Sequence, residues 1–266
     1  MSIDRLAFIG GGNMCEAIIS GAVHSSVIDP GNITVNDISR PRLEYLREKY
    51  GVRTETHYKD AVNQASIVVL SVKPQVFNEI SKEISQLLTD KAVISIMAGW
   101  GNKKLSALLN KYTRYLRVMP NMPAMAGCAM SVLSTDNTLS EEEYTFAKNL
   151  FSSIGQIEEL PERLFNAVIG ISGSGPAYAY MFIEALADAG VLYGLPRETA
   201  YRLAAQTIKG SATMVQSTGL HPGVLKDMVC SPGGTTIQAV KMLEDRALRG
   251  TIIAGVEACV KRAEEL

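Results

Sequence analysis

A glycine cluster directly after a short apolar run is the feature that most constrains this fold. Residues 6–9 predict a buried strand, the glycines of 10–12 follow it, and residues 14–23 carry apolar side chains at helical spacing. Gly10 permits the tight turn, and Gly12 lets backbone N–H groups approach a pyrophosphate at the helix N-terminus. The pattern therefore predicts dinucleotide binding, and the alternative is a structural glycine turn in an unrelated α/β fold.

Strand and helix patterns alternate through the rest of the first half. The apolar run at 67–70 is short and rich in β-branched residues, as expected of a strand buried on both faces. We therefore predict an α/β fold with an N-terminal Rossmann-type doubly wound parallel sheet. The other expected strands lie near 33–35, 93–96 and 115–118, and the expected helices near 41–50 and 74–88.

The second half has a different pattern, because the β-branched runs stop near Glu162. Long alanine-rich stretches at 176–192, 197–216 and 247–263 predict helices. We expect residues 1–161 to form the dinucleotide-binding domain and 162–266 to form an all-helical, substrate-binding and dimerisation domain. So many apolar helix faces cannot all be buried within about 100 residues. A homodimer is the predicted solution, and a compact monomeric bundle is the alternative.

Composition excludes several classes of protein. The 266 residues carry 26 Lys and Arg against 27 Asp and Glu, so neither nucleic acid nor an anionic membrane is an expected partner. The four cysteines are too far apart in sequence for a metal-knuckle spacing, the three histidines are isolated, and we expect no metal. With neither a secretory signal pattern nor a long apolar span, we expect a soluble, cytoplasmic globular protein.

Asp37 and the residues after it bear on the choice of cofactor. An acidic residue at the end of the second strand accepts hydrogen bonds from the adenosine ribose and repels a 2′-phosphate, which favours NADH. Arg40 and Arg42 follow within one turn and are able to pair with a 2′-phosphate, and Ser39 is able to bond one. The alternative is that Ser39 caps the next helix and the arginines form a solvated face. The preference between NADH and NADPH therefore stays open.

Two further strand ends carry candidate ligand-binding residues. Ser71 to Pro74 follows the buried strand 67–70, at the carboxyl edge where ligands bind in a doubly wound sheet, and Lys73 has the length to reach phosphate or ribose. Met97 to Gly99 occupies the matching position one strand along and leaves room for a nicotinamide ring. Ordinary strand-end turns are the alternative for both. Residues 120–123 hold two prolines and predict a stiff, extended segment that does not readily begin a helix.

Two loops in the second half combine small residues, hydroxyls and a helix start. Residues 172–178 (SGSGPAY) and 231–236 (SPGGTT) each predict a small-anion site, and simple helix caps are the alternative. The helix after Gly175 has no Lys or His to act as a proton-transferring group, and Glu184 and Asp188 are typical of a solvated stripe. This inventory favours a reaction that needs no strong protein base, such as reduction of an imine that enters already protonated.

At these loops the sequence resembles the pyrroline-5-carboxylate reductase family over nearly its whole length. The matching stretches are Ile9 to Met14, Val72 to Gln75, Arg117 to Asn121, Ser172 to Tyr178, and Leu225 to Asp227 through Ser231 to Thr236. The resemblance implies a Rossmann domain, a helical domain that interlocks with its partner in a dimer, and sometimes a larger ring. It also implies reduction of L-1-pyrroline-5-carboxylate to L-proline by NADPH or NADH, the last step of proline synthesis.

The resemblance assigns roles to residues through the matching motifs. It implies that Gly234, Thr235 and Thr236 hold the substrate carboxylate, with Thr236 nearest the ring nitrogen. Thr236 and Ser174 are the expected catalytic residues, and Ser231 and Gly233 complete the expected substrate loop. The expected cofactor-binding residues are Gly10, Gly12, Asn13, Met14, Asp37, Ser39, Val72, Lys73, Pro74, Met97, Ala98 and Gly99.

Two positions depart from the family pattern. Tyr58 stands where many members have an Asn beside the adenosine, and Asp37 stands where members that prefer NADPH often have a neutral or basic residue. Both departures concern the choice of cofactor and leave the reaction intact.

Two other functions compete with this interpretation. A hydroxy-acid or keto-acid reductase on a similar plan needs a catalytic Lys soon after the second-domain glycine loop, and residues 176–190 contain none. A non-catalytic NAD(P)-binding sensor needs no small-anion loops in its second domain, whereas this chain has two.

Overall fold

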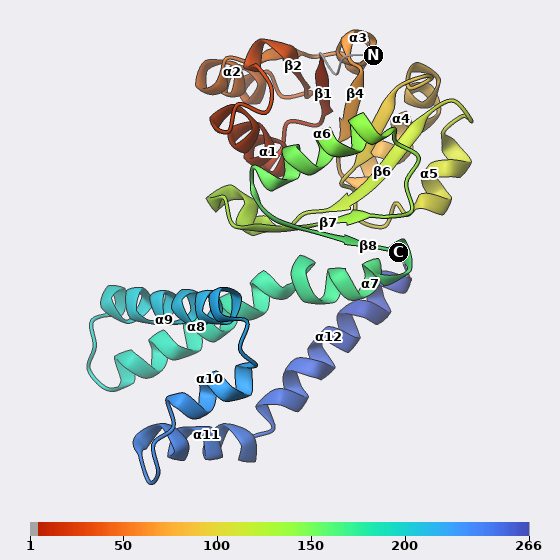
Figure 1. The fold of residues 1–266 in the computed structure, drawn as a ribbon. Helices are drawn as coiled ribbons and strands as arrows, with labels where there is room; N and C mark the ends of the chain where they lie inside the picture. The colour runs from red at the N-terminus through yellow and green to blue at the C-terminus, as the bar shows by residue number, and fades with distance from the viewer. Residues whose placement is uncertain (1–4, 266) are drawn as a thin grey trace. The chain divides into compact units, whose positions relative to one another are not determined.

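The computed structural model describes residues 5–265, which divide into two compact units (Figure 1). The first unit, here the sheet unit, contains residues 5–173 and 262–265, and the second, here the helical unit, contains residues 174–261. Within residues 5–265, no helix combines the length and the apolar character needed to cross a membrane.

The sheet unit is built on eight strands in the order β3-β2-β1-β4-β5-β6-β7-β8. Neighbouring strands run parallel, except that β7 is antiparallel to β6. The chain reverses direction across the sheet between β1 and β4, which is where open α/β sheets bind ligands. The strands are β1 (Leu6–Ile9), β2 (Ile33–Asn36), β3 (Arg53–Glu55), β4 (Ile67–Leu70), β5 (Ala92–Ser95), β6 (Arg114–Met119), β7 (Ala129–Ser134) and β8 (Gly155–Leu160).

Alternate strand side chains enter two different cores. Leu6 and Phe8 of β1 face a core shared with α1 (Asn13–His24), α2 (Arg40–Tyr50) and α6 (Glu141–Ser152). Ala7 and Ile9 face a core shared with α3 (Tyr58–Gln64), α4 (Pro74–Leu87) and α5 (Asn102–Leu108). Helices therefore cover both faces of the sheet, which explains why its strands are continuous apolar runs.

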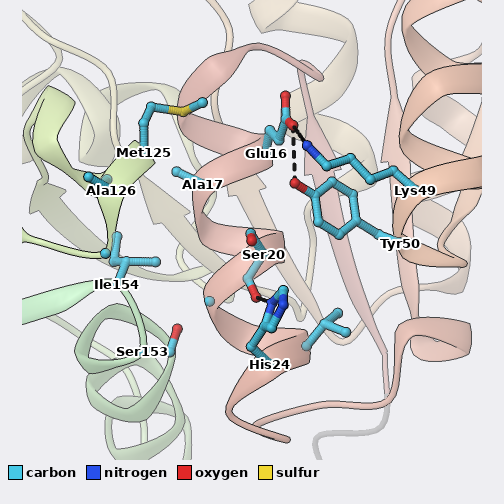
Figure 2. A pocket seen from close by; sticks show the side chains of 14 residues that line it. Glu16, Ala17, Ser20, His24, Lys49, Tyr50, Met125, Ala126, Ser153 and Ile154 are labelled. Carbon is cyan, nitrogen blue, oxygen red and sulfur yellow. Dashed lines mark hydrogen bonds and ion pairs between the residues drawn. The ribbon is translucent and has the colours of Figure 1, made fainter.

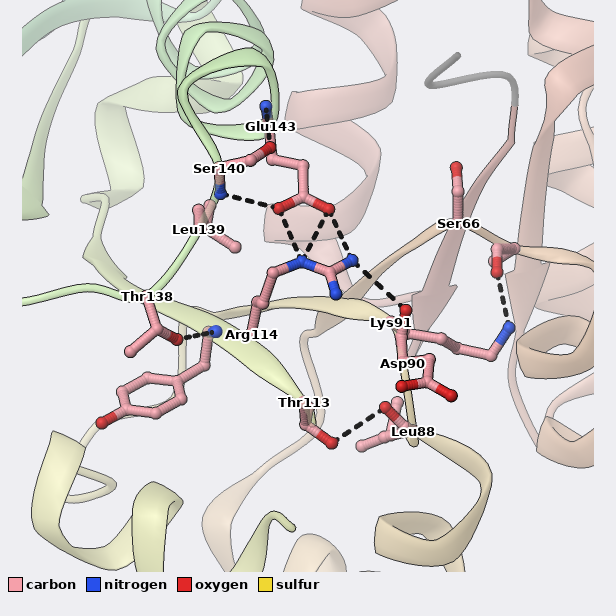
Figure 3. A network of polar contacts seen from close by, with 12 residues as sticks. Ser66, Leu88, Asp90, Lys91, Thr113, Arg114, Thr138, Leu139, Ser140 and Glu143 are labelled. Carbon is pink, nitrogen blue, oxygen red and sulfur yellow. Dashed lines mark hydrogen bonds and ion pairs between the residues drawn. The ribbon is translucent and has the colours of Figure 1, made fainter. Parts of the chain in front are cut away.

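An ion pair ties α6 to the first residue of β6. The Arg114 guanidinium donates to both carboxylate oxygens of Glu143 at 2.7–3.0 Å, and the Glu143 carboxylate also accepts the backbone N–H of Ser140 (Figure 3). The Ser140 hydroxyl in turn accepts the N–H of Glu143, which completes a capping box at the start of α6. The same carboxylate therefore caps the helix and anchors it to β6.

The segment after β8 packs on the sheet unit. A 3₁₀ turn (Glu162–Leu164), α7 (Phe165–Val168) and a π-helical turn (Ile169–Gly173) follow one another. Phe165 is fully buried under the Arg117 guanidinium, and Arg117 pairs with Glu162 at 2.8 Å. By compactness residues 162–173 group with the sheet unit, and the domain boundary after residue 161 stays a prediction.

The helical unit has little interior of its own. Its only buried apolar residues are Ala187, Ala200 and Ala204, where α8 and α9 pack together. Large apolar side chains such as Met181, Leu192 and Ile253 are exposed. The helices are α8 (Gly175–Leu192), α9 (Arg197–Thr218), α10 (Pro222–Met228), α11 (Thr235–Asp245) and α12 (Leu248–Glu264).

The structure confirms the predicted fold class and corrects the interpretation of one segment. The proline-rich stretch at 120–123 does enter a helix, because a 3₁₀ helix (Met122–Ala126) begins there with Pro123 in its first turn. Proline is tolerated at that position because the first N–H groups of a helix need no intrahelical acceptor. Sequence analysis did not identify β3, β7, β8, α3, α5 or α6.

Candidate functional site

The glycine turn after β1 has the geometry of a pyrophosphate cradle. Gly10 has φ +102°, and a Cβ there would lie 2.8 Å from the carbonyl oxygen of Ser71, so only glycine fits. A Cβ at Gly12 would meet nothing within 4 Å, and no side chain caps α1, which begins at Asn13. Exposed backbone N–H groups at a helix start, with open space before them, fit an anionic dinucleotide linkage.

Asp37 lies at the end of β2 and is bound to the glycine turn. Its carboxylate accepts the N–H of Gly11 at 2.8 Å and the N–H of Ser39 at 2.9 Å. Ser39 itself is the N-cap of α2, and its hydroxyl accepts the N–H of Arg42. The structure therefore joins two predicted cofactor residues, Asp37 and Ser39, to the predicted pyrophosphate turn.

The two arginines of α2 differ: the alternative of a solvated face fits Arg40 but not Arg42. Arg40 is exposed, but Arg42 donates from Nε to the carbonyl oxygen of Gly11 at 2.6 Å and pairs with Glu16 at 2.6 Å. Helix α2 packs beside the glycine turn, and this packing turns Arg42 inward. The sequence offers no signal for the pair, because the two residues are far apart along the chain.

Glu16 is the buried centre of a polar network that sequence analysis missed. Its carboxylate also accepts from Lys49 at 3.0 Å and from the Tyr45 and Tyr50 hydroxyls, and Figure 2 shows it pointing toward Lys49 and Tyr50. Burial raises the pKa of Glu16, but hydrogen bonds from Lys49, Arg42 and the two tyrosines outweigh it and lower that pKa to about 2. Glu16 is therefore ionised at every physiological pH.

The ends of β4 and β5 meet at the same edge of the sheet. Ser71 donates its hydroxyl to the carbonyl oxygens of Ile9 and Gly10, which brings the β4 end against the glycine turn. Val72 and Lys73 follow, and Pro74 starts α4 with Lys73 as N-cap. A cavity of about 550 Å³ opens here, lined by Pro74, Gln75, Asn78, Ala98, Gly99, Trp100 and Lys104.

Two predicted cofactor residues pack at least part of their side chains against the cores. Met97 is 2% exposed, and Met14 is half-buried against the core beneath α1. Met97 therefore offers only its backbone at the edge of the sheet, whereas part of the Met14 side chain remains exposed. Trp100 and Lys104 line the adjacent cavity, although sequence analysis did not select them.

Cys15 and Tyr58 occupy the two unusual positions near this edge. Cys15 is fully buried at the third small position of the glycine motif, and burial raises the pKa of its thiol. The Tyr58 hydroxyl donates to Glu83 of α4, and this hydrogen bond, with burial, raises the pKa of Tyr58 to about 12. Both groups are neutral at physiological pH.

The helical unit forms the second predicted loop as a tight turn before α11. The N–H of Gly234 donates to the carbonyl oxygen of Ser231 at 3.0 Å, and Gly233 has φ +67°. Gly234 is the N-cap of α11, with no side-chain cap, so Thr235 and Thr236 stand in the first turn. Hydroxyls and exposed N–H groups at this helix start are suited to a carboxylate.

Ser174 lies at the start of α8 within the helical unit. Its hydroxyl is 3.1 Å from the Cys259 sulfur of α12, and Tyr178 is the third member of this cluster. Among the hydrogen bonds of residues 5–265, none joins Ser174 to the loop 231–236. His221 accepts the N–H of Gly223 as the N-cap of α10, a structural role.

The predicted residues thus form two groups, one in each unit. The cofactor group, from Gly10 to Gly99, gathers at the carboxyl edge of the sheet. The loop from Ser231 to Thr236 gathers at the start of α11. Across residues 5–265 there is no cluster of three or more His, Cys, Asp or Glu side chains that fits a metal ion.

Comparisons with known proteins identify the family. A sequence model described as pyrroline-5-carboxylate reductase dimerisation matches residues 162–266, and one described as NADP oxidoreductase, coenzyme F420-dependent, matches residues 5–99. The chain is 45% identical to pyrroline-5-carboxylate reductase of Glycine max, over 98% of this chain and 95% of that protein. The chain belongs to the pyrroline-5-carboxylate reductase family.

Other members of the pyrroline-5-carboxylate reductase family agree in sequence and in structure. The Escherichia coli reductase is 40% identical over 98% of both chains. The solved Coxiella burnetii reductase superposes with a TM-score of 0.91 at 34% identity, covering 99% of this chain and 98% of that one. A Plasmodium falciparum reductase solved with NADP bound gives 0.89 at 30% identity, covering 100% and 98%.

Proposed function

We propose that this protein reduces L-1-pyrroline-5-carboxylate to L-proline with NADH or NADPH, the last step of proline biosynthesis. The observation that carries the proposal is that one chain of this family has both turns: a pyrophosphate turn in its sheet unit and a turn suited to a carboxylate in its helical unit. A dinucleotide and a small acid are the two ligands that this reaction requires.

The sheet unit binds and orients the cofactor. The N–H groups at the start of α1, around Gly12, Asn13 and Met14, hold the pyrophosphate. The Asp37 carboxylate accepts hydrogen bonds from the ribose hydroxyls. Val72 to Pro74 and Met97 to Gly99 line the nicotinamide half, with Met97 contributing only its backbone. The cofactor would supply a hydride for C5 of the substrate, whose imine nitrogen enters already protonated.

The helical unit binds the substrate. The N–H groups and hydroxyls at the start of α11 hold the substrate carboxylate through Gly234, Thr235 and Thr236, and Ser231 and Gly233 shape the turn. Thr236 lies nearest the ring nitrogen and hydrogen-bonds it as the imine becomes an amine. Ser174, at the start of α8, contributes its hydroxyl to the catalytic site. Catalysis therefore depends on position and electrostatics, with no strong protein base.

Self-association is part of the proposal. The dimerisation segment and the exposed apolar faces of α8 to α12 support a dimer in which helical units pack together. A larger ring of dimers and a cytoplasmic location stay predictions of the resemblance. The partner molecules are pyrroline-5-carboxylate, the nicotinamide cofactor and further copies of this chain.

The decisive experiment follows the absorbance of NADH and of NADPH separately, with pyrroline-5-carboxylate as substrate. Oxidation of either cofactor with formation of proline is the expected result. Cofactor binding without oxidation would contradict the proposal. It would then favour a hydroxy-acid or keto-acid reductase, or a sensor, and 3-hydroxy and 2-keto acids would be tested next.

A further inference from the structure

Glu16 is a buried carboxylate that the proposed reaction does not use. We infer that Glu16 is a specificity-determining residue: it holds Arg42 against the glycine turn, withdraws that arginine from a 2′-phosphate, and leaves Asp37 to select NADH over NADPH. The inference rests on the proposed function only in that the cofactor is a nicotinamide dinucleotide.

The contacts of Arg42 account for the donors that a phosphate would need. Its Nε donates to the carbonyl oxygen of Gly11 at 2.6 Å, and its Nη2 lies 3.3 Å from that of Gly12 and 2.6 Å from the Glu16 carboxylate. Bidentate recognition of phosphate needs two parallel N–H groups on one edge of the guanidinium. The edge formed by Nε and Nη2 is already engaged, and the two acceptors of Nη2 also remove it from the edge that it shares with Nη1.

The burial of Glu16 makes this arrangement hard to break. The Glu16 side chain is only 7% exposed, and its other oxygen holds Lys49 and two tyrosine hydroxyls, so the carboxylate is fixed in place. If Arg42 left, one cation of a largely buried carboxylate would be lost, which is unfavourable. Arg42 is therefore a structural partner of Glu16 and of the glycine turn.

Asp37 is then left to face the ribose without Arg42. Each of its oxygens accepts one backbone N–H, from Gly11 or Ser39, and retains a lone pair for a ribose hydroxyl. A 2′-phosphate at the same place would meet this carboxylate at close range. Arg42 is five positions beyond Asp37 in the sequence. An Arg42 side chain released from Glu16 therefore has the length to pair with a 2′-phosphate bound beside Asp37.

The test measures dissociation constants of NADH and NADPH by titration calorimetry on the full-length protein. We expect the wild type to bind NADH at least about tenfold more tightly than NADPH, a difference of about 1.4 kcal/mol. Glu16→Gln releases Arg42 and is expected to reduce the preference for NADH over NADPH, the ratio of the two dissociation constants, at least about fivefold. Adding Arg42→Met to Glu16→Gln is expected to restore the wild-type ratio.

Single substitutions separate specificity from structural support. Arg42→Met alone is expected to weaken both cofactors by the same factor, because it loosens the glycine turn without touching a 2′-phosphate. Lys49→Met is the matched control, since it removes the other cation of Glu16 and is expected to leave the ratio unchanged. Arg40→Met measures what an exposed arginine of the same helix contributes to NADPH binding.

Three results would overturn the inference. They are tighter binding of NADPH by the wild type, selective loss of NADPH binding in Arg42→Met, and an equal effect of Glu16→Gln on both cofactors. If Glu16→Gln does not fold, the wild-type ratio and Arg42→Met still decide. The binding ratio needs no turnover, so it stands or falls separately from the reduction of pyrroline-5-carboxylate.

Discussion

The two units of this protein bury their apolar residues in opposite ways. The sheet unit encloses a core on each face of its sheet, built from strands and six helices of the same chain. The helical unit buries three alanines and exposes Met181 by 69%, Leu192 by 79% and Ile253 by 66%. The comparison teaches that the first unit is complete within one chain, whereas the second needs further apolar surface from a partner.

The chemistry divides along the same line. The sheet unit presents one edge with a glycine turn, Asp37 and the ends of β4 and β5, which together suit a dinucleotide. The helical unit presents a single turn before α11, suited to a small carboxylate. Four tests, taken from the largest expected effect to the smallest, examine this division.

A charge on the exposed face of the helical unit gives the largest expected effect. Met181 lines an apolar pocket between α8 and α12 with Phe182 and Ile252. Met181→Asp is expected to raise the dimer dissociation constant about a thousandfold, roughly 4 kcal/mol, because the carboxylate would be desolvated in the interface. Analytical ultracentrifugation measures the change. Tyr112→Asp, an exposed aromatic position of the sheet unit, is the control and is expected to remain dimeric.

A pair of leucine substitutions compares the two units directly. Leu150→Ala, at a fully buried position of α6, is expected to lower the free energy of unfolding by about 2–5 kcal/mol at any protein concentration. Leu203→Ala, at a position of α9 that is 54% exposed, is expected to act only through association. Denaturant unfolding at two protein concentrations separates them. A large, concentration-independent loss in Leu203→Ala would show that the helical unit is stable alone.

Thr236→Ala tests the division of chemistry. Turnover is expected to fall about a hundredfold, since a hydrogen bond made to the reacting ring is lost, while the dissociation constant of the cofactor changes little. Stopped-flow turnover and calorimetry report the two quantities. Thr213→Ala removes a threonine that bonds only its own helix and is the matched control. Unchanged turnover in Thr236→Ala would remove that residue from the proposed mechanism.

The smallest expected effect is electrostatic and lies in the sheet unit. Burial raises the pKa of Glu143, but Arg114 and the N-terminus of α6 outweigh it and lower that pKa below its ordinary value. The ionised Glu143 carboxylate therefore stabilises the folded state above about pH 4.5, and this stabilisation is lost as the pH falls through the lowered pKa. Glu143→Gln is expected to cost about 1–3 kcal/mol at pH 7 and progressively less in acid. Thermal unfolding across pH measures this, and a pH-independent cost would contradict it.

The sequence predicted those elements whose pattern is local and strong. The apolar runs at 6–9 and 67–70 identified β1 and β4, since buried parallel strands are apolar throughout, and the glycine turn identified the start of α1. The sequence analysis did not identify β3 and β8, because these edge strands are partly exposed and carry charged residues such as Arg53 and Glu158. Helix α6 escaped although Ser140 and Glu143 form a capping box.

Within the site, backbone features were predictable and side-chain pairing was not. Gly10 and Gly12 act through backbone conformation and free space at single positions, and a glycine in the sequence directly indicates such positions. The pairing of Glu16 with Arg42 depends on how α1 and α2 pack, and no local pattern encodes it. The same holds for the contact of Ser174 with Cys259, whose residues come from the two ends of the helical unit.

The position of all eight strands within residues 6–160 has a consequence for synthesis. The ribosome finishes the entire sheet before it begins α8, and at about 5–20 residues per second the remaining hundred or so residues take roughly 5–20 seconds. The cofactor-binding half therefore has time to fold while its chain is still attached. The helical unit emerges after the sheet unit, and its apolar faces stay exposed to solvent until a second copy packs against them.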